Sequence, residues 1–246
     1  MSAAPRVVVV TGGGKGIGKA IVARFAASGD RVVAVGRDHR ALEATGAAAA
    51  EVCDVTDEDE VTALFERLGR VDVLINNAGV AVSAPLARTT LADWRAHLDV
   101  NASGAFLCTR AVVGAMIERG VGRIVTVAST AGRVGSRYTA AYTASKHAAV
   151  GLMRAVAAEV AGTGVTANAV CPTYVRTEMT SLSIARIVAA TDHSEDEAEA
   201  ALVNSSPLGR LLEPDEVAFA VAFLAAPEAA AINGQTLVLD GGGIQT

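Results

Sequence analysis

The chain has 246 residues, of which 51% are hydrophobic and 19% are charged, and its formal net charge is -5. This composition is typical of a globular protein and excludes a disordered or collagen-like chain. The charges are spread along the sequence without a basic stripe that would bind a phosphate backbone, so nucleic acid is not an expected partner.

Short apolar runs alternate with helical stretches along the chain. The predicted strands are Val7–Val10, Arg31–Val35, a weak one ending at Cys53, Val71–Ile75, Arg123–Val127, Val165–Val170 and Thr236–Leu239. The predicted helices are Gly16–Ser28, His39–Ala44, Asp57–Leu68, Leu91–Glu118, Ala140–Ala161 and Glu213–Ala225. Parallel strands joined by helices require right-handed crossovers. We therefore expect one Rossmann-type α/β domain over residues 1–246, a doubly wound parallel sheet of seven strands with helices on both faces.

One stretch, Met179–Ser206, does not fit the alternation of strand and helix. It is polar and acidic around His193–Glu197 and lies between the sixth strand and the last helix. We interpret residues 179–206 as a mobile substrate lid, with a solvated surface excursion as the alternative.

The cysteines and the apolar runs bear on where the protein works. Cys53, Cys108 and Cys171 are far apart and lack C-x-x-C spacing, so neither a disulfide framework nor a zinc site is predicted. The histidines show no metal-ligand spacing, and no metal is expected. The longest uninterrupted apolar stretches, such as Val217–Pro227, are shorter than a membrane span, and the first residues lack a signal-peptide pattern. We expect a cytoplasmic protein that does not bind a membrane.

A glycine-rich turn follows the first predicted strand. Residues 11–18 read TGGGKGIG, at the point where the strand gives way to a helix. Backbone N–H groups and the positive end of a helix dipole form an anion site there, which suits a pyrophosphate. The spacing is G-x-x-x-G-x-G rather than the usual G-x-G-x-x-G, so a purely structural turn is the alternative. The candidate cofactor contacts are Gly12, Gly14, Lys15, Gly16, Ile17 and Gly18.

The end of the second strand bears on the choice of nicotinamide cofactor. NAD-selective folds usually place a carboxylate here to bind the ribose hydroxyls, whereas this chain has Gly36 and Arg37. Arg37 and Lys15 are suited to the 2′-phosphate of NADP(H), because guanidinium and ammonium groups bind phosphate well. NADP(H) is favoured over NAD(H), with ordinary surface charges beside Asp38 as the alternative.

Tyr142 and Lys146 are four residues apart on a predicted helix, and their side chains therefore share one face. A free phenol with a pKa of about 10 is a poor base, but a neighbouring ammonium favours the phenolate. Ser129 ends the fifth strand at the sheet edge where such folds bind ligands, and a simple turn or N-cap serine is the alternative. Tyr138 is interpreted as a pocket wall.

Two asparagine-containing segments complete the candidate site. Asn76-Asn77-Ala78-Gly79 ends the fourth strand and is suited to contacts with the adenine ribose, although an ordinary turn has the same composition. Asn101 lies in an apolar helical stretch, where an unpaired amide would cost about 1 to 3 kcal/mol, and we expect it to have a partner. A G-x-S-x-G motif is absent from the sequence, which argues against a hydrolase.

These motifs, in their order and spacing, resemble the short-chain dehydrogenase/reductase family. The resemblance covers the whole chain and is greatest to NADPH-dependent 3-oxoacyl-acyl carrier protein reductases and to the ketoreductases of aromatic polyketide synthesis. It implies that Tyr142 is the general acid in reduction, and that Lys146 lowers the pKa of Tyr142 and binds the nicotinamide ribose. It also implies that Ser129 holds the carbonyl oxygen and that Asn101 anchors a water in a proton relay. A homotetramer is implied as well. Further cofactor contacts implied by the resemblance are Asp54 and Val55 at the adenine, Asn77, Ala78 and Gly79 along the groove, and Pro172, Val175 and Thr177 at the nicotinamide.

The chain departs from the family pattern in three places. The usual Pro-Gly after the sixth strand is Pro172-Thr173, and the segment Ala41–Glu51 is shorter than in many ketoacyl reductases. Basic residues that would meet an acidic carrier protein are only partly present, as Arg119, Arg123 and Arg133. The substrate is therefore expected to be carried by a protein or by coenzyme A, or to be a free ketone.

We expect NADPH-dependent reduction of a ketone, such as a 3-oxoacyl thioester or a polyketide. The alternative is NAD(P)-dependent oxidation of a 3-hydroxyacyl-CoA or another secondary alcohol. A non-catalytic dinucleotide-binding regulator is the least favoured interpretation, because such a protein has no need of Asn101, Ser129, Tyr142 and Lys146 together.

Overall fold

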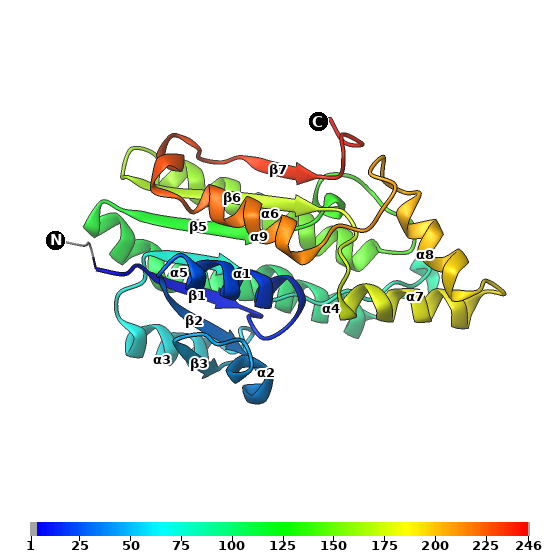
Figure 1. Ribbon diagram of the computed structural model, residues 1–246, viewed down its shortest axis with the longest axis horizontal. Helices are drawn as coiled ribbons and strands as arrows, with labels where there is room; N and C mark the ends of the chain where they lie inside the picture. The colour runs from blue at the N-terminus through cyan, green and yellow to red at the C-terminus, as the bar shows by residue number, and fades with distance from the viewer. Residues whose placement is uncertain (1–3, 246) are drawn as a thin grey trace.

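The computed structural model describes residues 4–245. Seven strands within this range form one parallel sheet in the order β3-β2-β1-β4-β5-β6-β7, and helices cover both faces (Figure 1). The predicted seven-stranded doubly wound architecture is confirmed. The strands are β1 (Val7–Thr11), β2 (Arg31–Gly36), β3 (Ala49–Val52), β4 (Val73–Asn76), β5 (Gly122–Val127), β6 (Val165–Pro172) and β7 (Thr236–Leu239). The α-helices are α1 (Gly16–Ala27), α2 (His39–Glu43), α3 (Glu58–Leu68), α4 (Leu91–Leu98), α5 (Gly104–Arg119), α6 (Ala140–Glu159), α7 (Glu178–Ala190), α8 (Glu195–Val203) and α9 (Pro214–Leu224).

Alternate side chains of the strands enter two separate cores, because neighbouring residues of a strand point to opposite faces. Val9 and Leu74 belong to the core that α3, α5 and α6 cover. Val8 and Ile75 belong to the opposite core, which α1 and α9 cover side by side in Figure 1. Burial on both faces explains why the central strands are continuous apolar runs.

The order of the strands reverses at β1. β1 pairs with β2 on one side and with β4 on the other, so the chain moves outward to β3 and then crosses back to β4. Ligands of doubly wound folds bind at the carboxyl ends of the strands where this reversal occurs. The glycine turn and the segment after Asn76 lie at these ends.

The long helix predicted over Leu91–Glu118 is interrupted. α4 and α5 are joined by a π-helical turn, Asp99–Ser103, which contains Asn101. A π turn adds one residue to a helical turn and re-aims the side chains around it, and such turns are frequent at functional sites. The apolar spacing shows that the stretch is helical but carries no sign of the extra residue.

The stretch Leu91–Arg119 is also long and apolar enough to cross a membrane by composition alone. This corrects the expectation that the apolar stretches fall short of a membrane span, which counted only uninterrupted apolar runs. In the fold, Leu107, Cys108, Val112 and Met116 of this stretch are buried in the core beneath the sheet. The structure thus uses α5 as a core helix.

The segment predicted as a lid, residues 179–206, contains most of α7 and all of α8. The two helices pack on each other through a small separate cluster of Ile184, Ala198 and Leu202. A capping box of Ser194 and Glu197 starts α8, so part of the acidic sequence that suggested a surface excursion is a helix start. The mobility of this α7–α8 pair stays a prediction.

Two arginines suggested as carrier-protein contacts lie at the opposite edge of the sheet. Arg123 is 7% exposed and donates hydrogen bonds to the carbonyl oxygens of Gly122, Gly164, Ala226 and Pro227 at the amino end of β5. Arg119 donates to the Val71 carbonyl near the same edge. Arg123 is a structural residue, and of the three only Arg133, after Ser129, lies at the edge with the candidate site.

Candidate active site

The glycine turn between β1 and α1 is built for close backbone contacts. Gly12 has a φ of +63°, in the left-handed region that favours glycine. A Cβ atom on Gly18 would lie 2.0 Å from the carbonyl oxygen of Gly12, so a side chain at Gly18 would collide with backbone. A Cβ atom on Gly12 would lie 2.9 Å from the Cα atom of Ala78. The turn can therefore pass tightly between β1, α1 and the end of β4.

The amino end of α1 is left free for an anion. Lys15 is the N-cap residue, and among the described residues no side chain makes a capping hydrogen bond there. The first turn of α1 is Gly16-Ile17-Gly18, whose N–H groups have no partner within the helix. This uncapped helix end and the glycine cradle fit the pyrophosphate of a dinucleotide cofactor.

Asn77 and Thr11 fasten the glycine turn to β4. The Nδ2 atom of Asn77 donates to the carbonyl oxygens of Thr11 and Gly12 at 3.0 and 3.1 Å. The hydroxyl of Thr11 accepts hydrogen bonds from the N–H groups of Asn77 and Ala78, both at 3.0 Å. The side-chain amide of Asn77 thus holds the turn in place. Thr11 was not singled out from the sequence, because a threonine at a strand end has many possible roles.

The two cations expected at the 2′-phosphate pair with different carboxylates. Arg37 is 73% exposed in its side chain and approaches Asp54 at 3.8 Å, whereas Lys15 pairs with Glu178 of α7 at 3.2 Å. Hydrogen bonds from Thr56 lower the pKa of the Asp54 carboxyl, first through its backbone N–H, and the charge of Arg37 adds to this. Arg37 and Asp54 mark the adenine end of the crevice, and Lys15 lies nearer to α7.

Val55, the other residue predicted at the adenine, is buried. A Cβ atom on Gly104 would lie 2.8 Å from the Cγ2 atom of Val55, so Val55 packs against the start of α5. The residues predicted at the nicotinamide follow β6. Val175 is buried and bridges to Leu212, and Thr177 is the N-cap residue of α7. Pro172 ends β6.

Thr177 brings the start of α7 over the glycine turn. A Cβ atom on Gly16 would lie 3.1 Å from the Cγ2 atom of Thr177. The structure therefore places the predicted nicotinamide end beside the predicted pyrophosphate end, as a single extended cofactor would require.

Asn101 has the hydrogen-bond partners that its burial demands. It is 3% exposed, and its Nδ2 atom donates to the Val80 carbonyl at 3.0 Å and to the Ser145 hydroxyl at 2.9 Å. Its Oδ1 atom accepts from the N–H of Val80 at 2.9 Å. A Cβ atom on Gly79 would lie 3.1 Å from Oδ1 and 3.6 Å from the Nζ atom of Lys146. Asn101 thus joins the segment after β4 to α6.

Tyr142, Ser129 and Lys146 converge at the carboxyl end of β5. Tyr142 is hydrogen-bonded to the Ser129 side chain, and the Nζ atom of Lys146 lies 5.8 Å from the centre of the Tyr142 ring. Lys146 also donates to the Val127 carbonyl at 3.0 Å. The Ser129 hydroxyl accepts from the Ala131 N–H as well, so the capping role and the contact with Tyr142 occur together.

Burial dominates the protonation of this group. It raises the pKa of the Tyr142 phenol above its usual value, and the hydrogen bond with Ser129 opposes the rise. Burial lowers the pKa of the Lys146 ammonium to about 8. The expected lowering of the Tyr142 pKa by Lys146 is not seen here and stays a prediction. A protonated phenol at neutral pH has the form that a general acid requires.

Tyr138, predicted as a pocket wall, is an exposed residue of the loop before α6. Its φ of +64° is in the left-handed region, and the guanidinium of Arg137 lies 5.2 Å from its ring centre. Its carbonyl oxygen accepts from the N–H of Ala84, which connects two loops beside the crevice.

Comparison with known proteins agrees with this geometry. Residues 12–243 match a family model described as Enoyl-(Acyl carrier protein) reductase. The chain belongs to the short-chain dehydrogenase/reductase family. This dehydrogenase/reductase is 40% identical to the D-threitol dehydrogenase of Mycolicibacterium smegmatis, over 96% of the chain and 92% of the relative. It is 38% identical to the 3-oxoacyl-acyl-carrier-protein reductase of Synechocystis sp., over 96% of each protein.

A crystal structure of an actinorhodin polyketide ketoreductase variant with NADPH aligns with a TM-score of 0.92, at 38% identity and over 98% of both chains. The dehydrogenase/reductase is thus an NAD(P)-dependent oxidoreductase that acts on CH–OH groups or on the corresponding ketones. Within residues 4–245 it holds no group of three or more His, Cys, Asp or Glu residues arranged for a metal ion.

Besides Thr11, sequence reasoning missed two residues that the structure places at this site. Ser145 accepts from Asn101 and donates to the Tyr142 carbonyl at 2.7 Å. His97 lies beside Tyr142, whereas the sequence indicated only that the histidines lack metal-ligand spacing. A signal for His97 was available, since it is four residues before Asn101, but the π turn between them made helical spacing an unreliable guide.

Proposed function

We propose that this oxidoreductase uses NADPH to reduce a ketone, and that its substrate is a 3-oxoacyl thioester or a polyketide chain. The observation that carries the proposal is the hydrogen-bonded pair of Tyr142 and Ser129, with Lys146 beneath it and Asn101 on the neighbouring helix. The names of the Synechocystis relative and of the actinorhodin ketoreductase support the substrate class. A carrier protein or coenzyme A would bear the acyl chain.

In this mechanism the ketone oxygen accepts hydrogen bonds from Ser129 and Tyr142. When bound, NADPH supplies the hydride that adds to the carbonyl carbon. Tyr142 gives its phenolic proton to the oxygen, so one hydride and one proton convert the ketone to a secondary alcohol. Lys146 stabilises the phenolate that remains and binds the nicotinamide ribose. Asn101 anchors a water through which the phenol regains its proton.

The glycine turn and the uncapped end of α1 would hold the pyrophosphate of the cofactor. Asp54 and Val55 would contact the adenine, Ala78 and Gly79 the groove, and Val175 and Thr177 the nicotinamide. The preference for NADPH rests on Arg37, whose exposed guanidinium follows Gly36 at the position where NAD-selective folds offer a carboxylate. Lys15, which pairs with Glu178, is the second candidate for the 2′-phosphate.

The alternative is oxidation of a secondary alcohol, such as a polyol or a 3-hydroxyacyl-CoA, with NAD(P). The relationship to D-threitol dehydrogenase favours it. In that direction Tyr142 must act as a base, and burial raises its pKa and so disfavours the phenolate.

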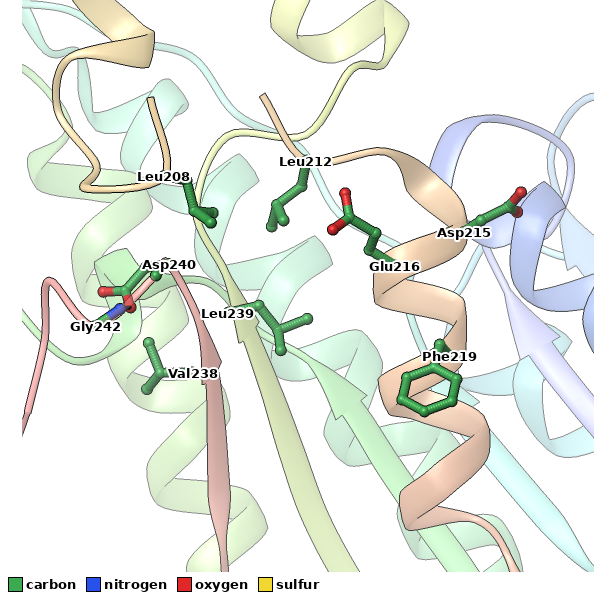
Figure 2. A pocket seen from close by; sticks show the side chains of 10 residues that line it. Leu208, Leu212, Asp215, Glu216, Phe219, Val238, Leu239, Asp240 and Gly242 are labelled. Carbon is green, nitrogen blue, oxygen red and sulfur yellow. Dashed lines mark hydrogen bonds between the residues drawn. The ribbon is translucent and has the colours of Figure 1, made fainter. Parts of the chain in front are cut away.

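We further propose a cytoplasmic homotetramer. Phe219 of α9 is 60% exposed and borders a hollow that apolar side chains line, among them Leu212 and Leu239 (Figure 2). Leu91 of α4 and Phe106 of α5 are also exposed apolar side chains. A tetramer with two-fold symmetry requires two separate interfaces, for which the two places are candidates. The cytoplasmic location is supported by three free, buried cysteines, Cys53, Cys108 and Cys171.

The test compares oxidation of NADPH and NADH by the purified protein, with a small 3-oxoacyl thioester and a cyclic ketone as acceptors. Thioester reduction with NADPH is the expected result. Tyr142→Phe should lower kcat about 10²- to 10⁴-fold, the usual contribution of a general acid, with the Kd for NADPH unchanged. Turnover of a polyol with NAD+ and of neither ketone would favour the alternative, and full activity of Tyr142→Phe would contradict the mechanism.

A further inference from the structure

His97 of α4 is buried with both ring nitrogens occupied. It is 1% exposed, its Nδ1 atom lies 2.7 Å from the Asp93 carbonyl oxygen, and its Nε2 atom lies 2.9 Å from the backbone nitrogen of Val82. A carbonyl oxygen can only accept, so Nδ1 carries the proton. The N–H of Val82 can only donate, so Nε2 must offer a lone pair. The imidazole is therefore neutral and held in one tautomer by two backbone groups.

The same ring contacts the proposed general acid. The rings of His97 and Tyr142 meet edge to face, with their centres 6.2 Å apart and their planes at 75°. Aromatic rings prefer this arrangement because the edge of one ring is positive and the face of the other is negative. One side chain thus connects the phenol on α6 with the loop that follows β4.

That loop, Val80–Val82, has its backbone held by three side chains from three helical segments. Asn101 of the π turn accepts a hydrogen bond from the N–H of Val80 and donates one to the carbonyl oxygen of Val80. Arg186 of α7 donates to the carbonyl oxygen of Ala81 at 3.1 Å, and His97 accepts from the N–H of Val82. Of the three, only His97 also contacts Tyr142.

We propose that His97 is a positioning residue for the reduction. It acts through Val82 and through the ring of Tyr142, and it fixes the separation between the loop Val80–Val82 and the phenol. The inference rests on the proposed function of the site, in which the carbonyl of the substrate binds to Tyr142. The role requires the lone pair on Nε2, which an apolar side chain of similar size does not offer.

Two substitutions separate this role from simple core packing. His97→Asn retains a donor close to Nδ1 but does not reach Val82, whereas His97→Gln places an amide oxygen near the position of Nε2. Loss of one hydrogen bond corresponds to about a five- to tenfold effect. We expect His97→Asn to raise the KM for the ketone or lower kcat/KM by this factor with the Kd for NADPH unchanged, and His97→Gln to recover most of the loss.

A matched control is available on α6. His147 makes the same type of contact with the carbonyl one turn earlier, Nδ1 to Thr143 at 2.9 Å, but its side chain is exposed and makes no second hydrogen bond among the described residues. His147→Asn should leave the kinetics unchanged. If His97→Asn behaves like His147→Asn, or if His97→Gln and His97→Asn lose activity equally, the positioning role is contradicted.

Amide hydrogen exchange of the wild-type protein tests the contact independently of how the variants fold. The N–H of Val82 should be protected despite its place in a surface loop, and rapid exchange would overturn the inference. The two proposals fail in different ways. Absence of ketone reduction by the wild-type protein contradicts the proposed function, whereas normal kinetics of His97→Asn in an active enzyme contradicts the role of His97 alone.

Discussion

The glycine turn and the α7–α8 pair meet at the candidate site, and they are held by different kinds of contact. The turn is fixed by backbone: Gly18 lies against Gly12, and the amide of Asn77 holds two successive carbonyl groups. The α7–α8 pair is held by a cluster of three buried apolar side chains with three partly buried ones against it, and by the hydrogen bond from Arg186 to the Ala81 carbonyl. Exposed ion pairs such as Lys15–Glu178 and Arg176–Glu199 add to this, although exposed pairs stabilise little.

This difference matches the demands on the two regions. A dinucleotide cofactor presents the same pyrophosphate whatever the substrate is, and a turn made of backbone contacts reproduces one shape. Substrates vary, and a pair of helices with its own small cluster can shift without disturbing the main cores. We therefore expect substitutions in the turn to affect cofactor binding and substitutions in the pair to affect the ketone.

Among the substitutions that compare these two regions, the largest effect is expected from Gly18→Ala. The new methyl group would collide with the backbone carbonyl of Gly12 and with the amide of Asn77, and neither can move without opening the turn. A cost of about 3 kcal/mol, the upper end for overpacking, corresponds to about a hundredfold weaker NADPH binding. Isothermal titration measures it. Gly151→Ala, at an open position on α6, is the control, and normal NADPH affinity of Gly18→Ala would contradict the account of the turn.

Arg37→Asp is expected to reverse the cofactor preference. A charge-assisted hydrogen bond contributes about 1.5 to 3 kcal/mol, so kcat/KM with NADPH should fall about tenfold or more. The value with NADH should not fall, because NADH lacks the 2′-phosphate. Arg40→Asp, on the neighbouring helix, is the control for the change in surface charge. An unchanged ratio between the two cofactors would refute the role of Arg37.

A smaller effect is expected from Ile184→Val in the α7–α8 pair. Removing one methylene from a core costs about 1 kcal/mol, and here the loss falls on a cluster of three residues. The KM for the ketone should rise about fivefold or less, while the Kd for NADPH stays unchanged. Ile21 lies on the face of α1 that enters the core. Ile21→Val should lower the melting temperature and leave the KM unchanged. If both variants change the KM equally, the two regions are not independent.

The smallest effect concerns the segment that leads from α8 to α9. Arg210 pairs with both carboxylate oxygens of Glu216, at 2.7 and 2.8 Å, and lowers the pKa of Glu216 to about 2. A depressed carboxyl pKa stabilises the fold above about pH 4.5, and this contribution is lost as the pH falls toward 2. Because the pair is exposed, Glu216→Gln should lower the melting temperature by at most about 3 °C at pH 7. The difference should shrink below about pH 4.5 and vanish near pH 2, and a difference that grows in acid would contradict this sign.

The fold could be predicted from the sequence almost completely, because parallel strands buried on both faces leave apolar runs that few other structures produce. Two features could not. In the π turn Asp99–Ser103, the backbone hydrogen bonds span five residues instead of four. The apolar spacing of the sequence does not reveal this change. The acidic run that starts α8 and the polar residues of α7 made the sequence of this pair resemble a loop, although both segments are helical.

The candidate site was predictable where one residue type in one place is required, as for Gly12, Gly18 and the pair of Tyr142 and Lys146. It was not predictable where a role depends on which distant group lies opposite. The partners of Lys15 and of His97 come from contacts across the fold, Glu178 for one and Val82 for the other. Local sequence carries no record of such pairings.

The segment from Asn77 to Val82 has one more consequence. Asn77 at its start holds the glycine turn, and Val82 at its end is held by His97. One segment of six residues therefore connects the two halves of the crevice. A ligand that orders one end of such a short segment removes part of the entropy that a second ligand would lose at the other end. Thermodynamic linkage then requires reciprocity: NADPH should increase affinity for the ketone by the same factor as the ketone increases affinity for NADPH.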